Sequence, residues 1–134
     1  MTTGAQAASA KIEPLGRLLS WAAVGVEPRR MGEGPIEATR KALSRAKLSL
    51  SDIDLFEIND SFTVQYIAVE NALGLDRDRV NRNGGAIAIG HPMGATGTRL
   101  ALSALYQLRR RGGGRALCTL CVGGGQGVAA IFEA

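Results

Sequence analysis

The chain has 134 residues, of which 46% are hydrophobic and 21% are charged, a balance typical of one globular domain and not of a disordered chain. The net charge of +4 is modest, and no apolar run reaches the roughly 18 residues of a membrane span. The first residues lack the basic and apolar regions of a signal peptide, and two cysteines are too few for a disulfide scaffold. We therefore expect a cytoplasmic protein with no membrane partner.

The first half of the chain has the periodicities of alternating strands and helices. Residues 1–11 are small and polar, and they read as a short helix or a frayed end. Apolar residues occupy both odd and even positions of 15–26, which predicts a strand that is covered on both faces. A helix is expected over 35–47, because a proline suits its first turn, and a short apolar strand is expected over 55–58.

Two further helices follow. The first is expected over 62–73, with the polar run 59–61 as candidate N-cap residues and Gly74 at its end. The second, over 98–111, comes after a glycine-rich segment and is apolar on nearly every side. A helix of this kind is expected to be buried nearly all round, so we expect something beyond this small domain to cover its outer side.

The end of the chain predicts a hairpin. Apolar runs over 116–122 and 128–132 flank three consecutive glycines, which suit a tight turn between antiparallel strands. Strands that alternate with helices and end in a hairpin predict an α/β fold with a mixed sheet, parallel in part and antiparallel in part.

Twelve of the 18 glycines lie between Gly84 and Gly127, in two segments that also contain reactive side chains. The only histidine, His91, precedes a proline, which favours an extended loop conformation. Cys121 ends an apolar strand just before the three glycines, whose N–H groups can face an oxyanion. A thiol, an imidazole and free N–H donors suit acyl transfer. A turn histidine and a buried structural cysteine are the alternatives that these residues alone leave open.

The two glycine-rich segments resemble the C-terminal signatures of the thiolase family, whose members make and break carbon–carbon bonds between acyl-CoA units. The matching positions of the first segment are Asn81, Gly84, Gly85, Gly90, His91, Pro92, Gly94, Thr96 and Gly97. Those of the second are Cys121, Gly123, Gly124, Gly125 and Gly127. Looser matches lie at 59–62 and 31–35. The resemblance implies that residues 1–134 are a thiolase C-terminal domain with a thiolase-like fold, a three-layer α-β-α half around a mixed sheet.

The resemblance also implies catalytic roles. Cys121 would be the base that removes an α-proton from the second acyl-CoA. His91 would activate the nucleophilic cysteine and help to bind the thioester oxygen, and Asn59 would orient a water in the same oxyanion hole. The backbone N–H of Gly123 would donate to a second oxyanion hole. Loss of a proton from the weakly acidic carbon beside a thioester requires this stabilisation of the enolate.

The substrates and assembly follow from the same resemblance. Met31 and Phe62 would line the acyl and pantetheine pocket, acyl-CoA and CoA would be the ligands, and no metal or redox cofactor is implied. Dimers or tetramers are expected. The chain departs from the family at Asp60-Ser61, where Glu-Ala is usual, which changes the surroundings of Asn59 and leaves the substrate preference open.

The nucleophilic cysteine of the family belongs to an N-terminal half that we expect this chain to lack. Cys118 does not replace it, because it lies three residues before Cys121 on one strand and so on the opposite face. The expected function is therefore that of the C-terminal catalytic half of an acetyl-CoA C-acyltransferase, inactive without an N-terminal half or subunit. Its reaction would be reversible Claisen condensation and thiolysis in fatty acid metabolism. The alternative is a non-catalytic thiolase-fold module for oligomerisation or scaffolding.

Three other hypotheses are weaker. Cys118 and Cys121 form a Cys-x-x-Cys pattern, but a zinc site would need further ligands, and the pattern lies within a strand. Seven arginines and no acid lie between Arg79 and Arg115, which suits a solvated face better than nucleic acid because aromatic residues are scarce. Decarboxylating condensing enzymes of the same superfamily lack a cysteine equivalent to Cys121.

Overall fold

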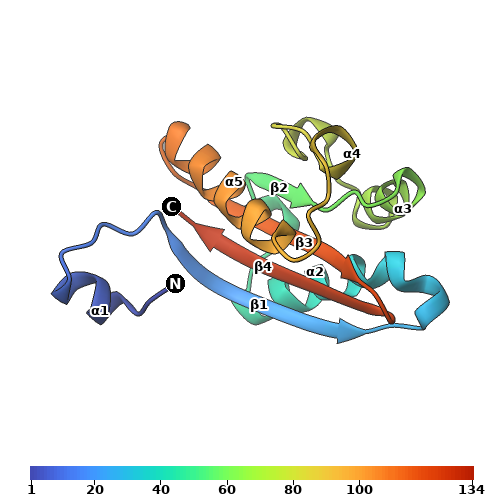
Figure 1. Cartoon of the computed structure of the whole chain (residues 1–134), viewed down its shortest axis with the longest axis horizontal. Coiled ribbons are helices and arrows are strands. Elements are labelled where there is room, and N and C mark those ends of the chain that lie inside the picture. Colours follow the sequence, from blue (N-terminus) through green and yellow to red (C-terminus); the bar gives the residue numbers. More distant parts are fainter.

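A four-stranded sheet with the strand order β1-β4-β3-β2 forms the centre of the computed structural model, which describes all of residues 1–134 (Figure 1). The strands are β1 (Arg17–Gly25), β2 (Leu55–Ile58), β3 (Arg115–Val122) and β4 (Gln126–Glu133). β4 pairs antiparallel with both β1 and β3, whereas β2 pairs parallel with β3. The predicted mixed sheet and its terminal hairpin are confirmed.

The helices connect the strands and flank the sheet. The α-helices are α1 (Gly4–Ser9), α2 (Gly34–Ala46), α3 (Thr63–Leu73), α4 (Ala86–Ile89) and α5 (Thr96–Arg110). Short segments of 3₁₀ helix form η1 (Pro28–Glu33), which has a kink at Arg30, η2 (Leu50–Asp52) and η3 (Arg77–Arg79). None of the helices combines the length and the apolar character that crossing a membrane requires.

The sheet separates two hydrophobic cores, which confirms the predicted three-layer α-β-α arrangement. On one face, apolar residues of α2 and α3 pack against all four strands, with Ile58, Leu117 and Ile131 fully buried among them. On the other face, Leu100 and Leu108 of α5 pack against β2 and β3 (Figure 1). Side chains of one strand therefore alternate between the two cores, as the pleat requires.

The expectation that β1 is covered on both faces is wrong for this chain. β1 is an edge strand that is covered on one face only, and Trp21 on its other face is 57% exposed. The cause is that α5 lies over β2 and β3, and one helix of about 10 Å diameter spans about two strands spaced about 4.8 Å apart. α5 buries one side, while Leu102 and Tyr106 on its outer side are exposed within this chain. The expected cover for that side would come from outside this chain and stays a prediction.

The polar run 59–61 does not cap α3, contrary to expectation. Phe62 occupies the N-cap position and makes no side-chain capping bond. The predicted C-terminal end is correct, because Gly74 adopts the left-handed conformation with φ of 62°. Asn59 and Asp60 are instead buried at the carboxyl end of β2. The side chains of the polar run 59–61 are therefore available for contacts elsewhere, including those of a functional site.

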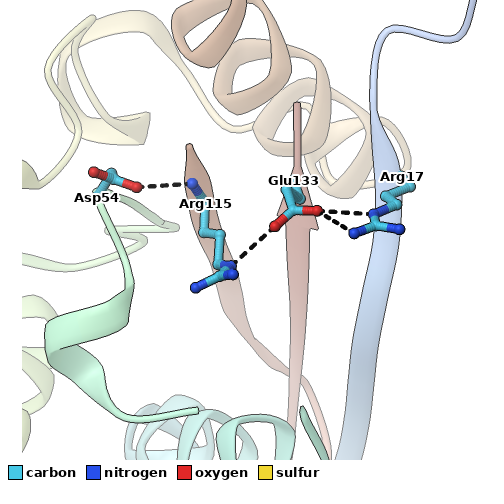
Figure 2. Close-up of polar contacts among 4 residues, drawn as sticks. All are labelled: Arg17, Asp54, Arg115 and Glu133. Atoms are coloured by element: carbon cyan, nitrogen blue, oxygen red, sulfur yellow. Dashed lines mark hydrogen bonds and ion pairs between the residues drawn. The ribbon is translucent and has the colours of Figure 1, made fainter. Parts of the chain in front are cut away.

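A chain of charged contacts ties the four strands together at the end of the sheet opposite Cys121. Glu133 accepts hydrogen bonds from Arg17 Nε at 2.8 Å and from Arg115 Nε at 3.0 Å, and Asp54 Oδ2 accepts one from the Arg115 amide at 2.8 Å (Figure 2). The Arg17 and Arg115 guanidinium groups hold the pKa of Glu133 below its usual value. These contacts link β1, β4 and β3 to the residue that precedes β2.

Candidate active site

The predicted site residues meet where the parallel strands β2 and β3 end. Asn59 follows β2, and its N–H donates to the Thr119 carbonyl of β3 at 2.9 Å. Cys121 lies two residues further along β3. Because parallel neighbours end at the same edge of a sheet, the two side chains converge there, at the edge where ligands of open α/β sheets usually bind.

The glycine-rich segment is held against the outer edge of β2 by Asn81. The Asn81 Oδ1 accepts the Ile58 N–H and its Nδ2 donates to the Ile58 carbonyl, both at 2.8 Å. Asn81 adopts φ of 46°, a conformation that asparagine tolerates well. This pair of bonds extends the pairing of β2 beyond the sheet and directs the chain that follows toward Asn59.

Asp60 then fixes the short helix that leads to His91. Its carboxylate accepts hydrogen bonds from the N–H groups of Ala86 and Ile87, the first two residues of α4. α4 ends at Ile89, and its C-cap residue Gly90 directly precedes His91. The glycine-rich segment was expected to be a loop, and α4 escaped prediction because four residues show no helical periodicity.

Five side chains form one chain of polar contacts at this edge. His91 Nε2 lies 3.4 Å from Asn59 Nδ2, which donates to Ser61 Oγ at 2.7 Å. Ser61 Oγ in turn lies 3.7 Å from Cys121 Sγ. At the other end, His91 Nδ1 lies 2.8 Å from Thr96 Oγ1. The structure therefore brings together His91, Asn59 and Cys121, which the sequence had singled out.

The direction of the hydrogen bonds follows from the donors available. The Thr96 hydroxyl donates its one hydrogen bond to the Pro92 carbonyl at 3.0 Å, so its oxygen accepts a hydrogen bond from the N–H at His91 Nδ1. The network thus assigns the tautomer with the proton on Nδ1, and the lone pair of Nε2 faces the Asn59 amide. Asn59 is fully buried, and its Oδ1 has no partner in the protein. The Asn59 Oδ1 therefore remains available to accept a hydrogen bond beside the His91 imidazole.

The two cysteines lie in different surroundings, as strand alternation predicted. Cys118 belongs to the core beneath α5, where burial and then the nearby Glu57 raise the pKa of its thiol. Cys121 is 8% exposed and faces Ser61 on the other side of the sheet. Both thiols are free. Cys118 thus lies in a hydrophobic core, whereas Cys121 lies beside the polar side chains at the edge of the sheet, and its catalytic role stays a prediction.

Gly123 begins the turn after β3, and its backbone N–H has no hydrogen-bond acceptor within the protein. It is exposed, and a Cβ built on it would contact nothing. An unpaired N–H two residues beyond Cys121 is the kind of donor that can bind an oxyanion. Its role stays a prediction.

The predicted pocket residues lie on neighbouring elements at the surface. Met31 is half-buried in η1, and Phe62 at the start of α3 is 58% exposed. η1 packs on α3, where Gly32 faces the side chain of Gln65. A surface hollow of about 480 Å³ between η1 and α2 includes neither residue and lies apart from His91 and Cys121. The assignment of Met31 and Phe62 to a substrate pocket stays a prediction.

Sequence reasoning placed Asp60 and Ser61 next to Asn59, and Thr96 in the motif, but it predicted none of the contacts that these three residues make at the site. The signal for the first two was their place after a short buried strand, but the same polar run also suits a helix N-cap. Thr96 is five residues after His91, and only the turn that folds these two together reveals the contact. No group of three or more His, Cys, Asp or Glu side chains gathers in the arrangement of a metal site.

Comparison with known proteins gives consistent results. Residues 12–134 match the family model described as "Thiolase, C-terminal domain". An acetyl-CoA acetyltransferase of Shinella zoogloeoides is 54% identical over 129 residues, which are 96% of this chain and 33% of that protein. The chain thus spans about a third of the length of this relative.

Solved structures agree with the sequence match. Human mitochondrial 3-ketoacyl-CoA thiolase is similar at a TM-score of 0.97 and 44% identity, over 99% of this chain and 34% of that one. The human mitochondrial 3-ketoacyl-CoA thiolase in complex with CoA is similar at a TM-score of 0.95, over 98% of this chain and 33% of that one. The chain belongs to the thiolase family, and it corresponds to the C-terminal domain of that family.

Proposed function

We propose that this chain is the C-terminal catalytic portion of an acyl-CoA C-acyltransferase. The observation that carries the proposal is the continuous chain of contacts from His91 through Asn59 and Ser61 to Cys121, at the carboxyl ends of two parallel strands. An imidazole and a thiol joined in this way suit a reaction that needs both an oxyanion site and a base.

In the proposed condensation, the Cys121 thiolate removes a proton from the carbon beside the thioester of one acyl-CoA. The electron pair left behind is delocalised onto the thioester oxygen, toward which the Gly123 N–H donates. The carbanion equivalent attacks the carbonyl carbon of an acyl group held as a thioester on a second cysteine. A carbon–carbon bond forms, the carbon–sulfur bond to that cysteine breaks, and its thiolate leaves.

His91 and Asn59 serve the acyl thioester in this proposal. The Nε2 lone pair can accept the proton of the incoming nucleophilic thiol, after which the imidazolium can donate to the thioester oxygen. The unpartnered Oδ1 of Asn59 can accept a hydrogen bond from a water, whose other proton then faces the same oxygen. The nucleophilic cysteine would come from a part of the protein outside this chain, because Cys118 is buried on the other face.

The proposal extends to the substrate and to the partners. CoA thioesters are the substrates, in keeping with the similarity to a thiolase solved in complex with CoA. Exposed apolar side chains near His91, such as Ile87, Ile89 and Met93, suit contact with an acyl or pantetheine chain or with a further part of the protein. We also propose assembly into dimers or tetramers, a role in fatty acid metabolism and a cytoplasmic location, which suits two free thiols.

The decisive experiment joins the preceding two thirds of the Shinella zoogloeoides relative to this chain, which takes the place of the last third. The readout is CoA-dependent cleavage of a 3-ketoacyl-CoA. We expect turnover in this chimera, and a loss of at least about 100-fold on replacing Cys121 by serine, because general base catalysis contributes about 10²–10⁴-fold. Cys118→Ser is the matched control and should retain turnover.

Near-normal turnover of the Cys121→Ser chimera would remove Cys121 from the mechanism. A folded, assembled chimera without any turnover would instead favour a non-catalytic module. Native mass spectrometry of the same sample separates this outcome from failed assembly.

A further inference from the structure

We propose that Ser61 is a positioning residue whose hydroxyl donates a hydrogen bond to the Cys121 sulfur and stabilises its thiolate. The inference deepens the proposed function, since it rests on the role of Cys121 as the base. It concerns the side chain that lies between Asn59 and Cys121 in the chain of polar contacts. A hydroxyl there adds a contact that an alanine side chain cannot make.

The geometry leaves one acceptor for the Ser61 hydroxyl. Asn59 Nδ2 donates to Ser61 Oγ at 2.7 Å, so the oxygen already accepts from that side. The remaining neighbour is Cys121 Sγ at 3.7 Å, which is within the range of hydrogen bonds to sulfur. The serine hydroxyl can therefore donate a hydrogen bond to the sulfur while its oxygen accepts one from Asn59.

The surroundings of Cys121 leave few other groups that stabilise a thiolate. No carboxylate, guanidinium or ammonium group hydrogen-bonds any member of the polar chain, and His91 is its only titratable group besides the thiol. On β4, the residue opposite Cys121 is Gly127. In η1, which packs on β3, Arg30 is paired with Glu33. A hydrogen bond from Ser61 is thus the polar contact that the thiolate would lose on its removal.

A hydrogen bond to the thiolate has two opposing consequences. It increases the fraction of Cys121 that is ionised near neutral pH, and it lowers the intrinsic nucleophilicity of each thiolate. The two effects separate on a pH–rate profile, because the first vanishes once the thiol is fully ionised. A change in access to the sulfur would shift the rate equally at every pH.

The test measures the rate at which iodoacetamide alkylates Cys121 in this chain, from pH 6 to pH 11, by mass spectrometry of the peptides. Cys118 is the internal control, because it lies in the core beneath α5, where we expect it to react only through unfolding. Ser61→Ala removes the hydroxyl, and Ser61→Thr retains one. Because the assay reads the thiol directly, it does not depend on catalytic turnover.

We expect Ser61→Ala to react about three- to tenfold more slowly than the wild type at pH 7, and as fast or faster at pH 11. Ser61→Thr should follow the wild-type profile within about twofold at pH 7. Superimposable profiles for Ser61→Ala and the wild type, or a uniform change at every pH, would overturn the proposal. In the second case Ser61 affects access only. The two assays can also disagree. If the alkylation profiles of Ser61→Ala and the wild type cross as expected but the chimera shows no turnover, the proposed function is overturned and the Ser61–Cys121 hydrogen bond is supported.

Discussion

The Asp60 carboxylate accepts a hydrogen bond from the Ala86 N–H, and this contact couples the residue beside Asn59 to the helix that leads to His91. Asp60 is buried, and the Ile87 N–H also points to its carboxylate. Two catalytic candidates from distant parts of the chain are thus joined by a residue that is not itself in the polar chain.

Replacing Asp60 by alanine should loosen α4 and with it the placement of His91. Removal of such a cap costs about 0.5–2 kcal/mol, and here it also leaves two N–H groups without an acceptor. We expect faster hydrogen exchange of the α4 amides in this chain and at least about tenfold slower turnover in the chimera. Asp60→Asn keeps one acceptor oxygen and should give intermediate values. Unchanged exchange in Asp60→Ala would show that α4 is held by other contacts.

Gly85 should be intolerant of a side chain for the same reason. A Cβ built on Gly85 would overlap the Asp60 carboxylate, so Gly85→Ala should lower the free energy of unfolding by about 1–3 kcal/mol. Gly97→Ala is the matched control, because its Cβ would meet nothing and alanine favours the α5 helix in which it lies. Urea unfolding measures both variants.

A double-mutant cycle tests the origin of this cost. In the Asp60→Ala background the overlap is absent, so Gly85→Ala should destabilise much less than in the wild type. Equal costs in the two backgrounds would place the strain elsewhere, in the backbone conformation at Gly85.

The elements predicted from the sequence are those whose stability is local or rests on a strong pattern. α2, β2 and the β3–β4 hairpin show apolar periodicity, and their ends lie within one or two residues of prediction. Burial was predicted less well, because it depends on what lies above each face. β1 is apolar on both parities, yet Trp21 is exposed, since the sequence does not tell how far one helix extends across a sheet.

The site was predicted in part for a similar reason. His91, Asn59 and Cys121 were found through motif residues, whereas the contacts of Ser61 and Thr96 arise only once β2, β3 and the glycine-rich segment lie side by side. Asp60 was misread as a cap of the following helix α3. It accepts the first N–H of α4 instead, 26 residues further along the chain, and no sequence pattern predicts that helix.

Glu133 should stabilise the sheet in a pH-dependent way. The Arg17 guanidinium, followed by that of Arg115, holds the pKa of Glu133 below its usual value, so its contribution is present at neutral pH. It is lost as the pH falls through the folded-state pKa, where the carboxylate is protonated. Glu133→Gln should therefore destabilise by less than about 1 kcal/mol at pH 7 and low salt, because Arg17 is exposed.

The comparison with the wild type at several pH values isolates this group. The difference in free energy of unfolding between Glu133→Gln and the wild type should shrink toward acid pH and at 1 M salt. A difference that is independent of both would assign the effect to packing of the side chain and not to its charge.

The contribution of Glu57 to the free energy of unfolding should change with pH in the opposite direction to that of Glu133. It is 1% exposed beneath α5, and burial raises the pKa of its carboxyl, partly offset by hydrogen bonds from Gln107 at 2.6 Å and Ser103 at 3.3 Å. The folded state therefore binds a proton more readily than the unfolded state. Its contribution is most favourable below the unfolded-state pKa, declines as the pH rises to the folded-state pKa, and is constant above it.

Glu57→Gln removes this titration while it keeps an oxygen that can accept from Gln107. The free energy of unfolding of the variant minus that of the wild type should thus increase as the pH rises from about 4 toward neutrality, and then level off. Urea unfolding at pH 4, 5.5, 7 and 8 measures this difference, from which the titration of all other carboxylates cancels. A difference that stays constant from pH 4 to pH 8 would mean that the pKa of Glu57 is the same in the folded and unfolded states. The contacts from Gln107 and Ser103 would then fully offset the burial of the charge.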